Sequence, residues 1–111
     1  MEELKDELLK DLQIELADEL HNESDVALLS LKIKNAIREV IQHRNYQKHH
    51  DKAFIDRDIQ QFYSVVHNLV IYDWNTIGAE GEQSHSENGT SRSYIDRGKH
   101  FAAVTHFATI L

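Results

Sequence analysis

Apolar residues recur at helical spacing through most of the first 77 positions, and no proline interrupts them. In the first segment, leucines stand four positions apart from Leu4 to Leu20, which places them on one face of a helix. Because proline breaks helices, its absence from the whole chain favours long uninterrupted ones. The pattern predicts a mainly α fold: a small antiparallel bundle of three main helices, over about 2–20, 25–44 and 52–77.

The second and third helices carry wider apolar stripes. Their apolar residues repeat at alternating steps of three and four, and further apolar residues thicken each stripe. Stripes of this width are typical of helix faces that pack into a core. The core is therefore predicted to contain Leu29, Ile33, Val40, Ile59, Phe62, Val66 and Leu69.

Polar residues at the breaks predict where helices begin and end. Asn22 can close the first helix in a left-handed conformation, and Gly78 can close the third in the same way. Ser24 and Asp51 are candidate N-caps of the second and third helices.

Asp73 continues the apolar stripe of the third helix, so its carboxylate lies at the edge of an apolar face and requires a partner. Arg92 is the candidate, with solvation of both side chains as the alternative.

Length, charge and composition bound the class of protein. The 111 residues correspond to one domain, and the absence of cysteine excludes a disulfide framework. The charged N-terminus shows no signal peptide, and no apolar run is long enough for a membrane span. We therefore expect a soluble protein of intracellular origin. The net charge of −7 argues against a domain that grips nucleic acid through phosphate neutralisation, although DNA can pass such a surface.

Residues 77–94, IGAEGEQSHSENGTSRSY, hold three of the four glycines and almost nothing apolar. Asn88-Gly89 is a strong signal for a tight β-hairpin turn. A two-stranded ribbon of this kind is marginal alone in water. We therefore predict a hairpin ribbon over 82–95 that contacts a partner, with interface residues Glu82, His85, Glu87, Asn88, Gly89, Arg92 and Tyr94.

The chain closes on an apolar tail, predicted over 100–111. Phe101, Val104 and Phe107 fit one helical face, and alternating residues fit a strand face, so the pattern leaves both conformations open. An apolar end either packs on its own domain or docks on another chain. The hypothesis here is that Phe101, Val104 and Phe107 anchor the tail on a partner.

The sequence predicts no catalytic site. The eight histidines show no zinc-ligand spacing, and no phosphate-binding loop or nucleophile motif is present. We expect no catalytic residue, no cofactor and no bound metal. The remaining enzymatic hypothesis is a metal-dependent enzyme that uses His49, His50 and nearby acidic residues.

Three predicted helices, then YDWNTIGAEGEQSHSENGTSRSY and a short apolar tail, resemble the head–tail connector (adaptor, or head-completion) proteins of long-tailed bacteriophages. The resemblance is most specific over residues 77–94. It implies a virion protein, made in the bacterial cytoplasm, that catalyses nothing. Copies would form a ring, usually of twelve, beneath the portal protein after DNA packaging. The ring would extend the DNA channel, through which DNA passes without sequence-specific binding, and offer a platform to the stopper or tail-completion protein.

The alternative is a small helical regulatory protein that binds its partner through the first helix. The leucines of that helix exceed what a lone surface helix needs, and its acidic face would then serve as an interaction arm. Deleting residues 1–20 separates the two hypotheses, because only the regulator needs them for binding.

Overall fold

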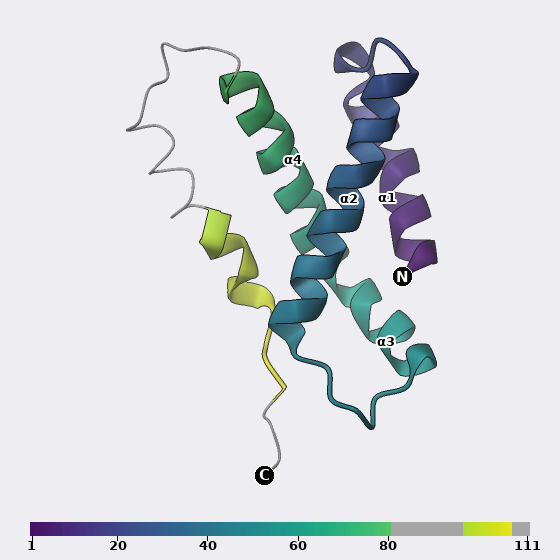
Figure 1. Ribbon diagram of the computed structural model, residues 1–111, viewed down its shortest axis with the longest axis vertical. Coiled ribbons are helices and arrows are strands. Elements are labelled where there is room, and N and C mark those ends of the chain that lie inside the picture. The colour runs from purple at the N-terminus through teal and green to yellow at the C-terminus, as the bar shows by residue number, and fades with distance from the viewer. Residues whose placement is uncertain (81–96, 108–111) are drawn as a thin grey trace.

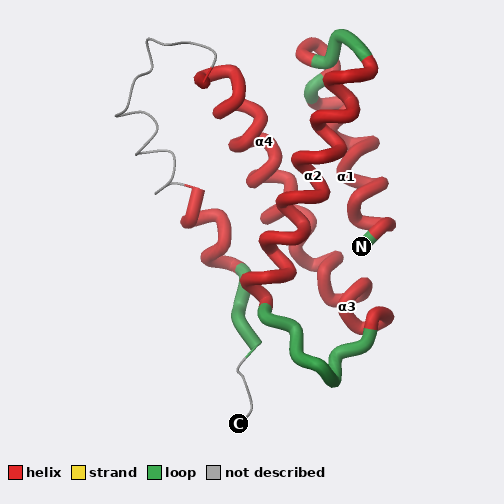
Figure 2. Tube along the Cα trace, in the orientation of Figure 1, coloured by secondary structure: helices red, strands yellow, loops and turns green. Residues whose placement is uncertain are grey.

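The computed structural model of the chain describes residues 1–80 and 97–107. Its elements are α1 (Glu2–Glu15), the 3-10 turn η1 (Ala17–Glu19), α2 (Glu23–Arg44), α3 (Lys52–Asp58), the 3-10 turn η2 (Ile59–Phe62), α4 (Tyr63–Glu80) and the 3-10 turn η4 (His100–Ala103). In the described ranges every regular element is helical, and none is a strand (Figure 2). The prediction of a mainly helical protein is confirmed. The predicted hairpin falls on residues outside those ranges.

Helices α1, α2 and α4 pack side by side around one apolar core (Figure 1). The chain reverses direction from α1 to α2 and again from α2 to α4, so the bundle is antiparallel, as predicted. All seven predicted core residues are buried. The full core is Leu4, Leu8, Leu12, Leu16, Leu29, Ile33, Ala36, Ile37, Val40, Ile59, Phe62, Val66, Leu69, Val70 and Val104.

The turn between the first two helices differs from the prediction. The first helix ends at Glu15, and η1 takes up residues that were expected to extend it to 20. The N-cap of α2 is Asn22, whose backbone is extended rather than left-handed and whose side chain accepts the N–H of Asp25 over 2.9 Å. Ser24 therefore lies inside the first turn. Asparagine and serine are comparable N-caps, so sequence alone did not choose between them.

The predicted third helix is two helices joined by η2. Asp51 caps α3 as predicted, since its side chain accepts the N–H of Phe54 over 2.8 Å. At η2 the chain changes direction, and α3 turns away from the line of α4 (Figure 1). Asp58, the last residue of α3, contacts Arg44 and Tyr46 at the end of α2. A straight helix over 52–77 was thus the wrong expectation, because this distant contact decides the direction of α3.

Gly78 does not end α4, which continues to Glu80. Glycine inside a helix costs only about 1 kcal/mol relative to alanine, so it permits a stop without imposing one. α4 therefore projects past the predicted boundary toward residues 81–96.

Two hydrogen bonds join α4 to α1 above the core. The hydroxyl of Tyr63 donates to Asp11 Oδ2 over 2.5 Å, and this bond together with burial raises the pKa of Tyr63 to about 12. His67 Nε2 lies 2.7 Å from Glu15 Oε2. Burial by itself lowers the pKa of His67, but the bonds to Glu15 and Asn68 and the charge of Glu15 outweigh it and raise the pKa.

We expect the imidazole of His67 to titrate above the ordinary histidine value of 6.5, and to titrate lower in the Glu15→Gln variant. Because the folded-state pKa is raised, the pair's stabilisation is fully present below the unfolded value and is lost as the pH rises through the folded value. An NMR titration of the His67 imidazole measures its pKa in the wild type and in the Glu15→Gln variant. Glu3→Gln, which changes an exposed acid on the same helix, is the control. Equal His67 pKa values in Glu15→Gln and wild type would contradict the pairing.

Candidate interaction site

Seven predicted interface residues lie outside the described ranges: Glu82, His85, Glu87, Asn88, Gly89, Arg92 and Tyr94. Their hairpin and their contacts stay predictions. The structure does place the residues on either side of this segment. α4 ends at Glu80, and the described chain resumes at Arg97.

Arg97 ties the returning chain to the helical body through two carboxylates. Its Nε donates to Asp73 Oδ1 over 2.8 Å and its Nη2 to Asp73 Oδ2 over 3.0 Å, a bidentate pair with α4. Nη2 also donates to Glu39 Oε2 of α2 over 2.6 Å. The hydrogen bond to Asp73 is the main cause that raises the pKa of Arg97, ahead of its bond to Glu39, although burial opposes both. Arg97 is therefore a permanent cation joining three segments, here called the Arg97 clamp (Arg97, Asp73 and Glu39).

The Arg97 clamp holds the residue at which the described chain resumes against the last turns of α4. Asp73 precedes Glu80 by seven residues, which corresponds to about 10 Å along an α-helix. The carboxylate of Asp73, at the edge of the apolar face of α4, does have a partner, as predicted. That partner is Arg97, which the spacing along the helix did not predict. The predicted pairing of Asp73 with Arg92 lies outside the described residues and stays a prediction.

The first part of the tail packs on its own chain. The ring of Phe101 stacks on the imidazole of His43 in α2, with centroids 3.9 Å apart and planes at 16°. Val104 is only 8% exposed and belongs to the core. The conformation that the sequence left open is a 3-10 turn followed by an irregular stretch over 104–107.

Phe107 closes the described part of the tail over the end of α2. Its backbone N–H donates to the carbonyl of Arg44 over 2.9 Å, and its carbonyl accepts from Asn45 Nδ2 over 2.8 Å. Asn45 ends α2 in the left-handed region, at φ 59°, which asparagine tolerates better than most residues. The Phe107 ring contacts His50 at a centroid distance of 4.5 Å. The described part of the tail thus reaches an aromatic cluster (Tyr46, His50, Phe54 and Phe107).

Arg44 holds this region together. Its Nε and Nη2 donate to the two carboxylate oxygens of Asp58 over 2.9 and 3.1 Å. Its Nη1 donates to the carbonyl of Thr105 over 3.0 Å, and its guanidinium lies 4.0 Å from the ring centre of Phe107. Tyr46 donates to Asp58 Oδ2 over 2.6 Å. One arginine therefore joins α2, the end of α3 and the tail.

These contacts bear on the predicted tail interface. The sequence left open whether the tail packs on its own domain or docks elsewhere, and the structure shows Phe101, Val104 and Phe107 on their own helices. Docking of these three side chains on a partner stays a prediction. Docking through all three side chains would require Val104 to leave the core first.

The adjacent histidines have a structural setting. His50 Nδ1 accepts the backbone N–H of Gln47 over 2.9 Å, and its ring stacks on Phe54 at 4.7 Å. Burial and the neighbouring His49 lower the pKa of His50, which suits the neutral acceptor form. Over residues 1–80 and 97–107, no three His, Asp or Glu side chains come together as a metal ion would require.

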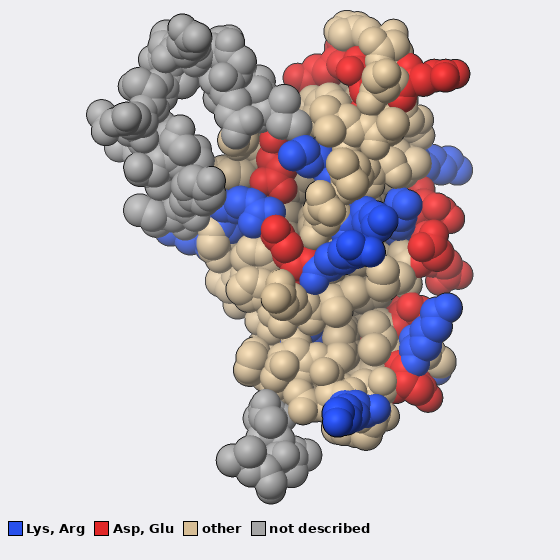
Figure 3. Space-filling view, in the orientation of Figure 1, with Lys and Arg blue, Asp and Glu red and all other residues tan. Residues whose placement is uncertain are grey.

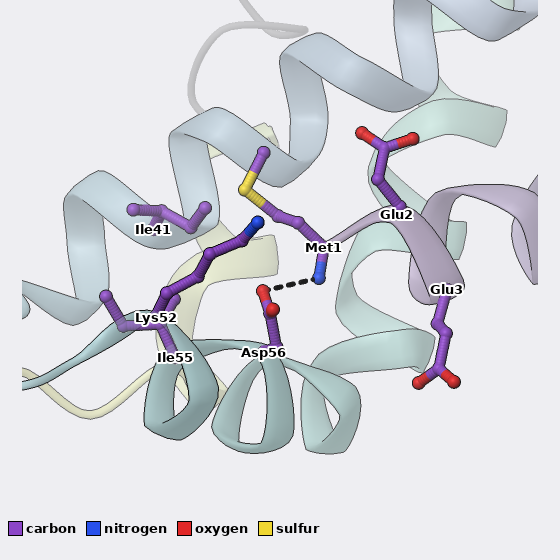
Figure 4. A pocket seen from close by; sticks show the side chains of 7 residues that line it. All are labelled: Met1, Glu2, Glu3, Ile41, Lys52, Ile55 and Asp56. Carbon is purple, nitrogen blue, oxygen red and sulfur yellow. Dashed lines mark hydrogen bonds and ion pairs between the residues drawn. The ribbon is translucent and has the colours of Figure 1, made fainter.

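An open hollow of about 630 Å³ lies where α1, α2 and α3 meet (Figure 4). No sequence pattern predicted it, since its lining comes from three distant stretches: Met1, Glu2, Glu3, Ile41, Lys52, Ile55 and Asp56. Asp56 Oδ1 pairs with the amine of Met1 over 2.9 Å, and Glu2 and Glu3 point away from that pair. The charges do not converge on one point, so the hollow is not assigned a ligand.

No helix in the described part of the chain combines the length and apolar character that a bilayer crossing requires. Comparisons with protein-family models, curated proteins and solved structures find no match to this chain.

Proposed function

We propose that this chain is a structural head–tail connector of a tailed bacteriophage or prophage. In this role copies form a ring, of twelve in the virion, beneath the portal protein after DNA packaging. The ring extends the DNA channel and offers a platform to the stopper or tail-completion protein. The chain catalyses nothing and binds no cofactor.

The observation that carries the proposal is that the helical body holds the residues on either side of the segment 81–96. The residues that flank this polar segment belong to the helical body: α4 ends at Glu80 on one side, and the Arg97 clamp holds Arg97 on the other. The same segment forms most of the stretch 77–94, which resembles the glycine- and serine-rich part of connectors. A segment held at both ends and poor in apolar residues is suited to contacting another protein rather than to filling its own core.

The charge balance supports a channel protein that does not grip DNA. The chain carries 19 acids against 12 lysines and arginines. Few cations mean few phosphate contacts, which supply most non-specific affinity for nucleic acid.

The regulatory alternative was suggested by the leucines of the first helix, and the structure gives these leucines another role. Leu4, Leu8 and Leu12 of α1 are 0% exposed and belong to the core of the bundle. α1 is thus a constituent of the fold, and deleting it would unfold the body rather than remove an arm. The expected portal anchor was the tail, through Phe101, Val104 and Phe107, and the ribbon 82–95 was expected against a neighbouring subunit or the next ring. Because the three tail side chains pack on their own helices, we propose 82–95 as the portal contact instead.

The test is co-sedimentation with purified portal rings encoded by the same phage or prophage genome. Wild-type protein is expected to sediment with the rings, and the triple variant His85→Ser, Glu87→Ser, Arg92→Ser to lose most of that binding. The matched control changes the same residue types at exposed positions elsewhere: His21→Ser, Glu19→Ser and Arg57→Ser.

Circular dichroism melts verify that both triple variants keep the helical body. Absence of wild-type protein from the portal fraction would refute the connector proposal. Equal binding by the two triple variants would leave the connector role but remove 82–95 as the contact.

A further inference from the structure

Among the described residues, two large apolar side chains are exposed: Ile14 of α1, at 73%, and Leu31 of α2, at 49%. Each lies on the outward side of its helix, opposite the buried stripe. Single exposed apolar residues are common on protein surfaces. The charges around these two residues distinguish them.

The surface around Leu31 is basic. Lys34 and Arg38 follow at three and seven positions, which places them on the same helix face, and both are exposed. Between residues 31 and 38 there are three cations and no acid. Figure 3 shows lysine and arginine side chains across the middle of the molecule, over α2. This surface is named the basic face (Leu31, Lys34 and Arg38).

The surface around Ile14 has the opposite sign. Glu7 precedes it by seven positions on α1, and Asp18 follows in η1, just past the end of the helix; both are exposed. Lys10, four positions before Ile14, is a cation on the same helix face. Residues 1–20 carry eight acids against two lysines. In Figure 3 acidic side chains gather along the edge over α1 and at the adjoining end of the molecule. This surface is named the acidic face (Glu7, Ile14 and Asp18).

We infer that the acidic face of one copy binds the basic face of the next, with Ile14 and Leu31 in contact at the centre. The two faces lie on different helices of one chain, so a single copy presents both halves of the contact. Pairing like faces would juxtapose charges of one sign, whereas unlike faces complement each other. A head-to-tail contact of this kind repeats and closes into a ring when the rotation closes. The inference deepens the proposed function, because it supplies a subunit interface for the ring. Closure of the contact into a ring rests on the proposed function, whereas the contact between two copies does not.

The test uses engineered cysteines in the full chain, which has none of its own. Protein carrying Ile14→Cys is mixed with protein carrying Leu31→Cys at low salt under mild oxidation. A disulfide forms only when the two Cα atoms approach within about 7 Å. The mixture is expected to give several-fold more linked dimer than either variant alone. Ala53→Cys, at an exposed position of α3, replaces each partner in turn as the control for random collision.

Charge reversal then tests the complementarity. Adding Lys34→Glu and Arg38→Glu to the Leu31→Cys protein is expected to bring cross-linking down to the Ala53→Cys level. Adding Glu7→Lys and Asp18→Lys to the Ile14→Cys partner is expected to restore it. High salt should weaken the unmodified contact, since about 1 M salt shortens electrostatic range to about 3 Å.

Two results would overturn the inference. Cross-linking of the mixture at the control level would show that the faces do not meet. Equal cross-linking by each single-cysteine protein alone would show that like faces meet instead. Because no portal is present, these outcomes are independent of the co-sedimentation test: the chain can self-associate without binding a portal, or bind a portal through 82–95 without this contact.

Discussion

Replacing Phe62 by alanine is expected to destabilise the protein by about 3–5 kcal/mol, a large part of the roughly 5–15 kcal/mol that a domain of this size has. Phe62 ends η2 and is 5% exposed in the core. Its ring also lies beneath the guanidinium of Arg44, 5.4 Å away. The truncation leaves a cavity where α3 turns into α4, and removes an apolar surface on which Arg44 rests. Urea unfolding followed by circular dichroism measures the loss.

The control is Ile14→Ala, measured in dilute protein. Ile14 is 73% exposed, so its truncation removes little buried surface. Exposed substitutions usually change stability by less than about 0.5 kcal/mol. A Phe62→Ala protein as stable as Ile14→Ala would contradict the packing of η2 in the core.

Replacing Asp58 by asparagine is expected to cost about 3 kcal/mol, because it leaves the Arg44 cation without its counter-ion in a partly buried site. The side chains of Arg44 and Asp58 are each 12% exposed. The carboxylate accepts from Arg44, Tyr46 and Gln61 at once. An amide keeps the shape but has one oxygen, so at least one of these donors loses its acceptor. Thermal or urea unfolding at neutral pH measures the cost, and Asp6→Asn, at an exposed carboxylate of α1, is the control.

The same pair predicts how stability depends on acid. Burial by itself raises the pKa of Asp58, but the hydrogen bonds from Arg44 and Tyr46 and the charge of Arg44 outweigh it, so the pKa lies below its ordinary value of 3.8. A lowered folded-state pKa stabilises above the unfolded value, and this stabilisation disappears as the pH falls through the folded value. The difference in stability between wild type and Asp58→Asn should therefore narrow below pH 3.8. A difference that stays constant through this range would show that the charge of Asp58 does not contribute.

The Arg44–Asp58 pair also bears on the proposed function. It orients the end of α2, on which the tail packs through Thr105 and Phe107. Arg97 performs a similar task on α4 and α2 for the chain that returns from residue 96. Both arginines position chain segments on the helical body. Their loss is therefore expected to alter where the proposed contact segment lies relative to that body, without altering the residues that make the contact.

The buried faces of the helices were determined by the sequence alone. The spacing from Leu4 to Leu16 and from Leu29 to Val40 placed the buried faces correctly, and Asp51 marked the start of α3. This information is local: a helix repeats every 3.6 residues, so a buried face appears as a period in the chain. The stripe that ran into Asp73 likewise showed that its carboxylate needed a partner.

Only the tertiary structure decided which distant groups meet. Asp58 reaches Arg44 where α3 gives way to η2, Asp73 pairs with Arg97, and the described part of the tail packs on His43 and Arg44. Such contacts join residues from 14 to 63 positions apart, and no period along the chain records them. Helix periodicity says which side of an element is buried. Which distant residue contacts that element depends on how the helices cross, and the crossing angles are set by the packing of the whole core.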